Sequence, residues 1–338
     1  MRKILGIAAL LFLCCAVTAL MNEAFRSPVN VENLLRRTSL YGVLGIGVSF
    51  VIVAGGIDLS IGSMVGLVGC LLPFLLARRL GDLDPGLAGT LGIGGLLLLS
   101  TLLGLLHGVL VTKVKLQPFI VTLCGLLLYR GAVRGIIGDE SPGFGNGWTG
   151  MRWIAIGRIP LPGIEGFALP AAMLVLLVLA LIAAWLLDLT VFGRWLQALG
   201  RNPEAARLSG VPVDRVVIGA YAFCSFCAGL GGILFVLDNN LAKPSDFGNF
   251  FELYAIAAAV LGGCALRGGE GSILGVVLGT AILRVLPNLT KLFGFPDQLE
   301  FALIGAVILV GVTADEGIRR LLLRRRGSSG ADQVTGRP

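Results

Sequence analysis

The segment Leu199-Gly200-Arg201-Asn202-Pro203-Glu204-Ala205-Ala206-Arg207-Leu208-Ser209-Gly210 lies between two long apolar runs, residues 167–187 and 216–237. Each run is close to the roughly 20 apolar residues that a helix needs to cross a bilayer. A polar, charged segment between two such runs is expected at a membrane surface. The pattern therefore predicts a membrane protein that keeps one structured connection outside the bilayer.

Local signals predict a short helix inside this segment. Asn202 is a favoured helix cap, and Pro203 suits the first helical position. Glu204 favours the positive end of a helix, while Gly210 can close it and Gly200 can permit the turn into it. We expect a rigid knob of the kind that contacts a soluble partner.

The composition predicts an all-α, polytopic integral membrane protein. Of the 338 residues, 56% are hydrophobic and only 14% are charged, and the mean hydropathy is +0.90. A soluble protein of this length needs more polar surface. Apolar runs and their breaks indicate about ten membrane helices, some of them short or broken: 3–22, 39–55, 62–79, 87–112, 119–137, 167–187, 216–237, 252–266, 272–286 and 298–315.

The first run follows Arg2 and Lys3, as in a signal peptide. It is longer than the apolar core of a signal peptide and has no clean cleavage site, which favours an uncleaved first helix. We expect the fifth, eighth and ninth runs to be short or interrupted, because such segments are tolerated inside a membrane bundle.

The distribution of Lys and Arg predicts that both termini are cytoplasmic, because positive residues stay inside. Arg36, Arg37, Arg78 and Arg79 are exceptions, and residues 138–166 form the largest expected outer connection. We divide the chain into a transmembrane domain, 1–318, and a basic cytoplasmic tail, 319–338, disordered after residue 327. The tail clusters basic residues after the last apolar run: Arg319, Arg320, Arg324, Arg325 and Arg326.

The basic net charge of +7 does not indicate a nucleic-acid partner, because the tail arginines suit anchoring and anionic membrane lipid.

Glycines at four-residue spacing predict close helix packing. Gly271, Gly275 and Gly279 are expected on one helix face, and Gly62 and Gly66 make a second pair. Small residues let helices approach closely in lipid. The stripe indicates a tight bundle or an oligomer interface.

The sequence Gly55-Gly56-Ile57-Asp58-Leu59-Ser60 interrupts two apolar runs. Asp58 can cap the following helix by accepting from amides near Ser60 and Ile61. An acid inside the membrane can also be functional, and a helix broken there exposes backbone to a pathway. We favour the cap, although the two roles are compatible.

No catalytic, metal or cofactor site is expected. His107 is the only histidine, the seven cysteines all lie in apolar runs, and Cys224-Ser225-Phe226-Cys227 has no second pair to complete a metal site. The motif GxxxxGK[ST] is absent, so the chain does not hydrolyse ATP by itself. Residues 238–246 are either an ordinary solvated loop or a docking surface for an external partner.

Three stretches resemble the membrane permease subunits of bacterial ABC importers for monosaccharides, the ribose-type family. They are Val53-Ala54-Gly55-Gly56-Ile57-Asp58-Leu59-Ser60-Ile61-Gly62-Ser63, the segment 198–211, and Leu253-Tyr254-Ala255-Ile256-Ala257-Ala258-Ala259-Val260-Leu261-Gly262-Gly263 with Gly268-Gly269-Glu270-Gly271-Ser272. A further match is Gln117-Pro118-Phe119-Ile120-Val121-Thr122-Leu123 with Arg130-Gly131. The likeness covers residues 30–315. Tyr254 stands where the family usually has Asp.

The resemblance implies a permease in the bacterial inner membrane that contributes geometry and no covalent chemistry. Its implied partners are a second permease subunit, identical or different, a cytoplasmic ABC ATPase and a periplasmic binding protein that delivers the sugar. The implied coupling residues are Gly200, Asn202, Pro203, Glu204, Ala205, Ala206, Arg207, Ser209 and Gly210. Gly55, Gly56, Asp58 and Ser60 would mark the path or a helix break. A self-sufficient secondary carrier or channel is the alternative.

Overall fold

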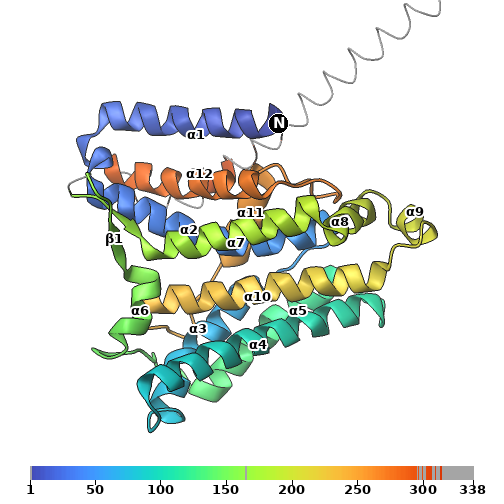
Figure 1. Ribbon diagram of the computed structural model, residues 1–338, viewed down its shortest axis with the longest axis horizontal. Helices are drawn as coiled ribbons and strands as arrows, with labels where there is room; N and C mark the ends of the chain where they lie inside the picture. Colours follow the sequence, from blue (N-terminus) through green and yellow to red (C-terminus); the bar gives the residue numbers. More distant parts are fainter. Residues whose placement is uncertain are drawn as a thin grey trace, which may run out of the picture.

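The computed structural model describes residues 2–163 and 166–294, together with 296, 299, 302–306, 309 and 313. This part of the chain is a bundle of long helices with one short antiparallel hairpin (Figure 1). The elements are α1 (Arg2–Met21), η1 (Glu23–Arg26), α2 (Pro28–Val53), α3 (Ile61–Arg78), α4 (Pro85–Thr112), α5 (Pro118–Ile137), α6 (Thr149–Ile156), β1 (Arg158–Pro160), β2 (Ala168–Pro170), α7 (Ala171–Ala184), η2 (Trp185–Leu189), α8 (Val191–Arg201), α9 (Pro203–Leu208), α10 (Val213–Asn239), α11 (Phe251–Leu261) and α12 (Ile273–Leu292).

Eight helices of the described chain are long and apolar enough to cross a membrane, and α11 is a shorter apolar helix. The predicted all-α membrane fold is therefore confirmed. Nine of the ten expected segments correspond to helices. Most of the tenth, 298–315, and the whole tail, 319–338, lie outside the described residues.

Two expected helix limits and one expected interruption are wrong. α2 begins at Pro28 rather than 39, because the polar residues of its first turns find partners in other elements, as when Glu32 accepts from Arg158 at 2.8 Å. α5 is unbroken over its 20 residues. α12 continues through Pro287 to Leu292 instead of ending at 286.

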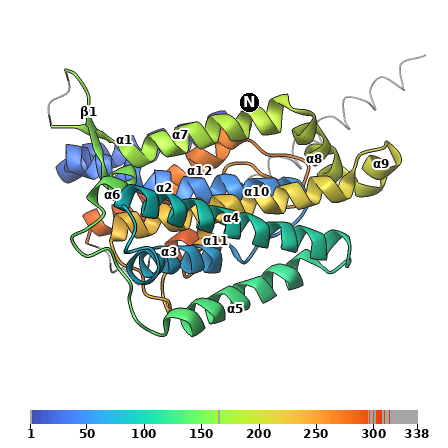
Figure 2. The same cartoon turned by 60° about the horizontal axis from the view of Figure 1, so that its bottom comes forward.

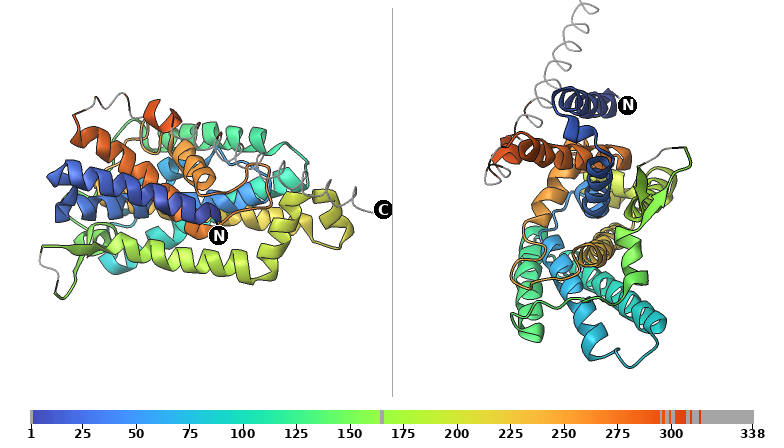
Figure 3. Two further views of the ribbon diagram at one scale, coloured as in Figure 1. Left: turned by 90° about the horizontal axis from the view of Figure 1, so that it is seen from above. Right: turned by 90° about the vertical axis from the view of Figure 1, so that its left-hand side faces the viewer.

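Three helices, α2, α3 and α10, form the centre of the bundle, and most of their residues are buried. Around them α1, α4, α5 and α7 expose large apolar side chains, as expected for helices that face lipid. Figure 2 shows α5 and α7 on opposite sides of the centre. The end-on view in Figure 3 places α1 outside α12, which it contacts.

The segment after α10 returns to the bundle and packs against α3. Arg130 of α5 donates to the carbonyls of Phe247, at 2.7 Å, and Pro244, at 3.2 Å. A Cβ atom at Gly66 would meet the Phe247 carbonyl. Lys243 and Asp246 remain exposed. The solvated-loop interpretation of residues 238–246 therefore holds for one side of the segment only.

Glycines on α12 allow close contact with α11. A Cβ at Gly275 would collide with the Gly262 carbonyl, and one at Gly279 with the Ala258 carbonyl. Gly271 does not share this face, because it lies in the turn before α12 and packs against Val53 and Cys264. Gly275 and Gly279 therefore pack α12 closely against α11 within the same chain, as the prediction of a tight bundle requires.

We expect Gly275→Leu to lower the amount of folded protein in the membrane several-fold, because the new side chain must push α11 and α12 apart. Gly94→Leu on α4 is the matched control, since nothing lies within 4 Å of its added Cβ. Size-exclusion chromatography of detergent extracts measures both. Normal levels of the Gly275 variant would show that this helix contact is dispensable.

Candidate functional site

The surface segment predicted to form a knob folds as α8 and α9 at one end of the bundle (Figure 1). The side chain of Asn202 caps α9 by accepting from the amides of Glu204, at 3.1 Å, and Ala205, at 3.0 Å. Pro203 is the first helical residue, and Gly210 leaves the helix with φ +80°. The predicted cap and closing turn are confirmed.

The outward face of α9 carries an apolar side chain between charges. Leu208 is 90% exposed. Together with Pro203, Glu204 and Arg207 it lines a shallow hollow of about 450 Å³. A single exposed leucine is common on protein surfaces, so the interest of Leu208 lies in its place beside charged residues on a helix at the end of the bundle. Sequence reasoning did not select Leu208, although its place one residue after Arg207 in a short surface helix was visible.

Ala206 differs from the expectation that it belongs to the docking face. It is only 5% exposed and packs inward, while Ala205 and Ser209 remain exposed. A six-residue helix has one inward face, and Ala206 occupies it.

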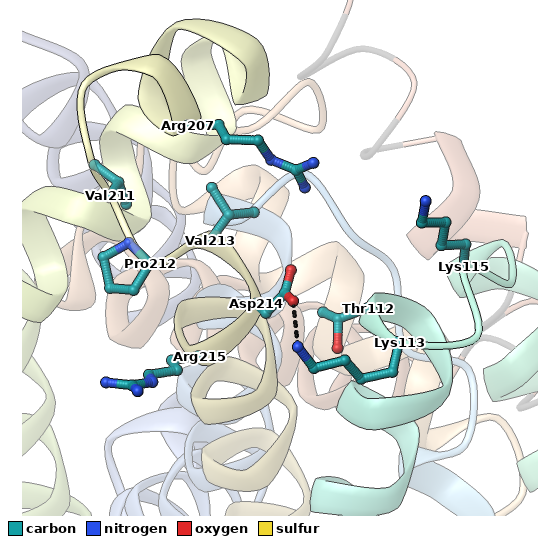
Figure 4. Close-up of a pocket in the computed structure, with 9 residues that line it drawn as sticks. All are labelled: Thr112, Lys113, Lys115, Arg207, Val211, Pro212, Val213, Asp214 and Arg215. Atoms are coloured by element: carbon teal, nitrogen blue, oxygen red, sulfur yellow. Dashed lines mark hydrogen bonds and ion pairs between the residues drawn. The ribbon is translucent and has the colours of Figure 1, made fainter.

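Beside α9 the ends of α4 and α10 form a basic hollow of about 520 Å³ (Figure 4). Lys113, the residue that directly follows α4, donates to Asp214 of α10 at 2.6 Å and so links the ends of the two helices. The remaining cations around the hollow are Lys115, Arg207 and Arg215. The positive charge of this end of the bundle suits an acidic surface or anionic lipid.

Gly200 does not form the expected turn into α9, because α8 continues to Arg201. Its role is close approach. A Cβ at Gly200 would collide with the Val53 carbonyl and the Gly269 amide. Gly269 donates its N–H to the Val53 carbonyl at 2.8 Å.

Three distant segments therefore meet at one place, which we call the glycine junction: residues 53–56, 199–201 and 267–271. A Cβ at Gly268 would lie 2.9 Å from the Cα atoms of both Gly200 and Gly55. Gly271 lies in the same turn and packs against Cys264. Burial raises the pKa of the Cys264 thiol to about 11. The thiol thus stays protonated and acts as a small apolar group.

Just beyond this junction, Asp58 organises the break between α2 and α3. It is fully buried, and its Oδ1 accepts from the amide of Ser60 at 2.8 Å and from the Ser60 hydroxyl at 2.7 Å. The expected bond to the Ser60 amide forms, but Ser60 is the N-cap residue of α3 and its side chain makes no capping bond. Asp58 therefore closes the turn just before α3, and the expectation that it caps this helix is wrong. Gly55 has φ +84°, a left-handed conformation that favours glycine, and Gly56 lies against Tyr221.

Polar side chains from three other helices surround this break. The Tyr221 hydroxyl of α10 donates to the Ile57 carbonyl at 3.2 Å, and Tyr129 of α5 hydrogen-bonds His107 Nε2 of α4 at 2.8 Å. The Oδ2 of Asp58 and the Nδ1 of His107 are buried without a partner. Sequence reasoning treated His107 as packing and missed both tyrosines. The only sign of these two tyrosines in the sequence is that each places a hydroxyl group within an apolar run.

Within the described residues, no group of three His, Cys, Asp or Glu side chains could hold a metal ion. The polar side chains around the break bond mainly to one another and to the backbone of the break itself.

We expect Asp58→Ala to lower the melting temperature of the purified protein more than Asp58→Asn. Alanine leaves two buried donors of Ser60 without an acceptor, at about 1–3 kcal/mol each, whereas asparagine keeps a side-chain oxygen. Thermal unfolding in detergent measures the difference, with the exposed Asp139→Ala as control. Equal loss of function in both Asp58 variants, at normal stability, would indicate that the charge itself is required.

The chain matches known transport proteins over most of its length. The family model described as "Branched-chain amino acid transport system / permease component" covers residues 30–312. The chain is 36% identical over 311 residues to the ribose import permease protein of Bacillus subtilis (strain 168), covering 90% of each chain. It is 34% identical over 308 residues to the ribose import permease protein of Escherichia coli (strain K12), covering 90% of this chain and 91% of the relative.

The xylose transport system permease protein of Escherichia coli (strain K12) is 32% identical over 366 residues, covering 93% of this chain and 91% of the relative. No solved structure matches the chain significantly. The resemblance noted in the sequence is confirmed: the chain belongs to the branched-chain amino acid transport system/permease component family, in the group of ribose and xylose import permeases.

Proposed function

We propose that this protein is the membrane-spanning permease subunit of an ABC importer for a monosaccharide or a similar small polar solute. The relatives named for ribose and xylose import support the substrate class. The observation that carries the proposal is the glycine junction, which joins a surface helix with an exposed leucine directly to a helix break in the membrane domain.

In the proposed mechanism a cytoplasmic ATPase docks on the outward face of α9. ATP binding moves the ATPase, and α8 carries that motion to Gly200. The junction then passes it to the end of α2 through Val53 and to the start of α12 through Gly269. Because no side chain separates these backbones, the segments cannot slide past one another without breaking the contact.

The proposal includes the partners that such an importer needs. They are a second permease subunit, identical or different, the ATPase at the α9 end and a periplasmic binding protein at the opposite end. The exposed apolar surface of α1, α4, α5 and α7 contacts membrane lipid. We place the protein in the bacterial inner membrane with both termini in the cytoplasm.

Co-purification of the permease with its ATPase and binding protein, followed by sugar uptake into proteoliposomes, tests the proposal. Uptake that requires both partners and ATP is expected. Uptake by the permease alone, driven by an ion gradient, would instead establish the secondary carrier.

We expect Glu204→Lys combined with Leu208→Asp to weaken ATPase binding at least about tenfold, because the pair removes the exposed apolar contact and reverses its neighbouring charge. Leu241→Asp, an exposed leucine after α10, is the control. Pull-down of the ATPase from detergent extracts, with protein amounts matched, measures the effect. Undiminished binding by the double variant would exclude this face of α9.

Reporter fusions at residues 150 and 205 are expected to lie on opposite sides of the membrane. Residue 150 lies in the first turn of α6 and residue 205 lies in α9, and these helices occupy opposite ends of the bundle (Figure 1). Alkaline phosphatase is active only outside and green fluorescent protein only inside, so paired fusions decide the matter. Finding both positions on one side would contradict the topology.

A further inference from the structure

Arg284 places a guanidinium group in the middle of the membrane domain. It is the twelfth of the 20 residues of α12, a helix long and apolar enough to cross the membrane. Its Cζ lies 3.9 Å from the ring centroid of Tyr41 in α2 and 4.5 Å from that of Tyr254 in α11. The two aromatic rings therefore fix the cation between three helices.

Two nitrogens of the guanidinium have no hydrogen-bond acceptor among the described residues. Its Nε and Nη2 atoms are buried without a partner, and no acid among the described residues forms an ion pair with it. Aromatic faces offset part of the cost of a charge in the membrane, but they leave the N–H groups unsatisfied. An intramembrane cation in this condition indicates a group that binds something the described part of the chain does not supply.

Polar residues lead from one end of the bundle to this cation. Asn30 of α2 and Asn288 of α12 bond each other, with Asn288 Nδ2 donating at 2.7 Å. Along α2, Arg37 and Tyr41 follow Asn30 at intervals of seven and eleven residues, so they share its helix face. Arg37 is exposed, and Arg284 and Asn288 are half-buried one turn apart on α12.

This polar line starts at the end of the bundle opposite the glycine junction. α2 runs from Asn30 toward Val53 at the junction, while α12 starts beside the junction and runs away from it. The line therefore reaches inward from the end where the binding protein is proposed to deliver its cargo. Substrate sites of transporters commonly lie near the bilayer midplane.

We propose that Arg284, held between Tyr41 and Tyr254, is a substrate contact in the translocation path and donates its free N–H groups to the hydroxyl oxygens of the passing sugar. The proposal rests on the importer function. Sugar hydroxyls supply the acceptors that the guanidinium lacks, and a planar group with donors on one edge can bind two neighbouring hydroxyls at once.

The test compares Arg284→Gln and Arg284→Lys with wild type in proteoliposomes that contain the permease, its ATPase and its binding protein. Uptake of radiolabelled ribose or xylose and binding-protein-stimulated ATP hydrolysis are measured on the same samples. Arg284→Gln is expected to reduce uptake at least tenfold while ATP hydrolysis stays within twofold. Arg284→Lys keeps the charge but loses the paired donors, and its uptake is expected to be intermediate.

Arg134→Gln is the control, because this arginine is exposed and pairs with Asp139 outside the polar line. Unchanged uptake in Arg284→Gln would overturn the proposal. A parallel loss of assembly, hydrolysis and uptake would also overturn it, since that result assigns Arg284 to packing or to contact with a second permease subunit. If the wild-type complex takes up neither sugar although both partners are present, the importer function fails for these two substrates, and the proposed contact with them fails with it.

Discussion

The hydrogen bond from the Gly269 amide to the Val53 carbonyl, 2.8 Å long, joins segments more than 200 residues apart. It forms only because Gly200, Gly55 and Gly268 carry no side chains where three backbones meet. The position of α9, the end of α2 and the start of α12 all depend on this contact. A surface helix attached through flexible linkers could move without moving the membrane domain, whereas one attached through backbone contact cannot.

The same two helices, α2 and α12, carry the junction at one end and the polar line at the other. Asn30 pairs with Asn288 far from the junction, and Tyr41 and Arg284 meet midway. Rigid helices transmit displacement along their length, so a shift at Val53 or Gly269 changes how these residues face each other. In the proposed mechanism, ATPase motion and sugar contact are therefore coupled through two continuous helices.

Local signals were sufficient for much of the fold. The Asn202 cap and the Gly210 turn depend on neighbouring residues only, and the long apolar runs identified nine helices. The errors concern residues whose role is set by distant partners. Gly200 does not form the predicted turn; a glycine is needed there because the backbones of Val53 and Gly269 come too close for a side chain. Ala206 does not lie on the predicted outer face, because it packs against the bundle. The extra turns of α2 depend on Glu32 meeting Arg158, 126 residues away. The partners of His107 and Arg284 likewise come from separate helices, which no spacing reveals.

Several unpaired polar atoms lie at the helix break and in the middle of α12. Asp58 Oδ2, His107 Nδ1 and two nitrogens of Arg284 are buried without partners. Each such group costs about 1–3 kcal/mol, and a protein selected for stability alone has simpler side chains available for these positions. A transporter must change its internal contacts during each cycle, so a polar group that has a hydrogen-bond partner in one arrangement loses it in another. The cost is consistent with side chains that bind sugar, water or each other only during part of the cycle. The glycine junction adds no such groups, because the residues that meet there are mainly glycines and the contact is between backbones.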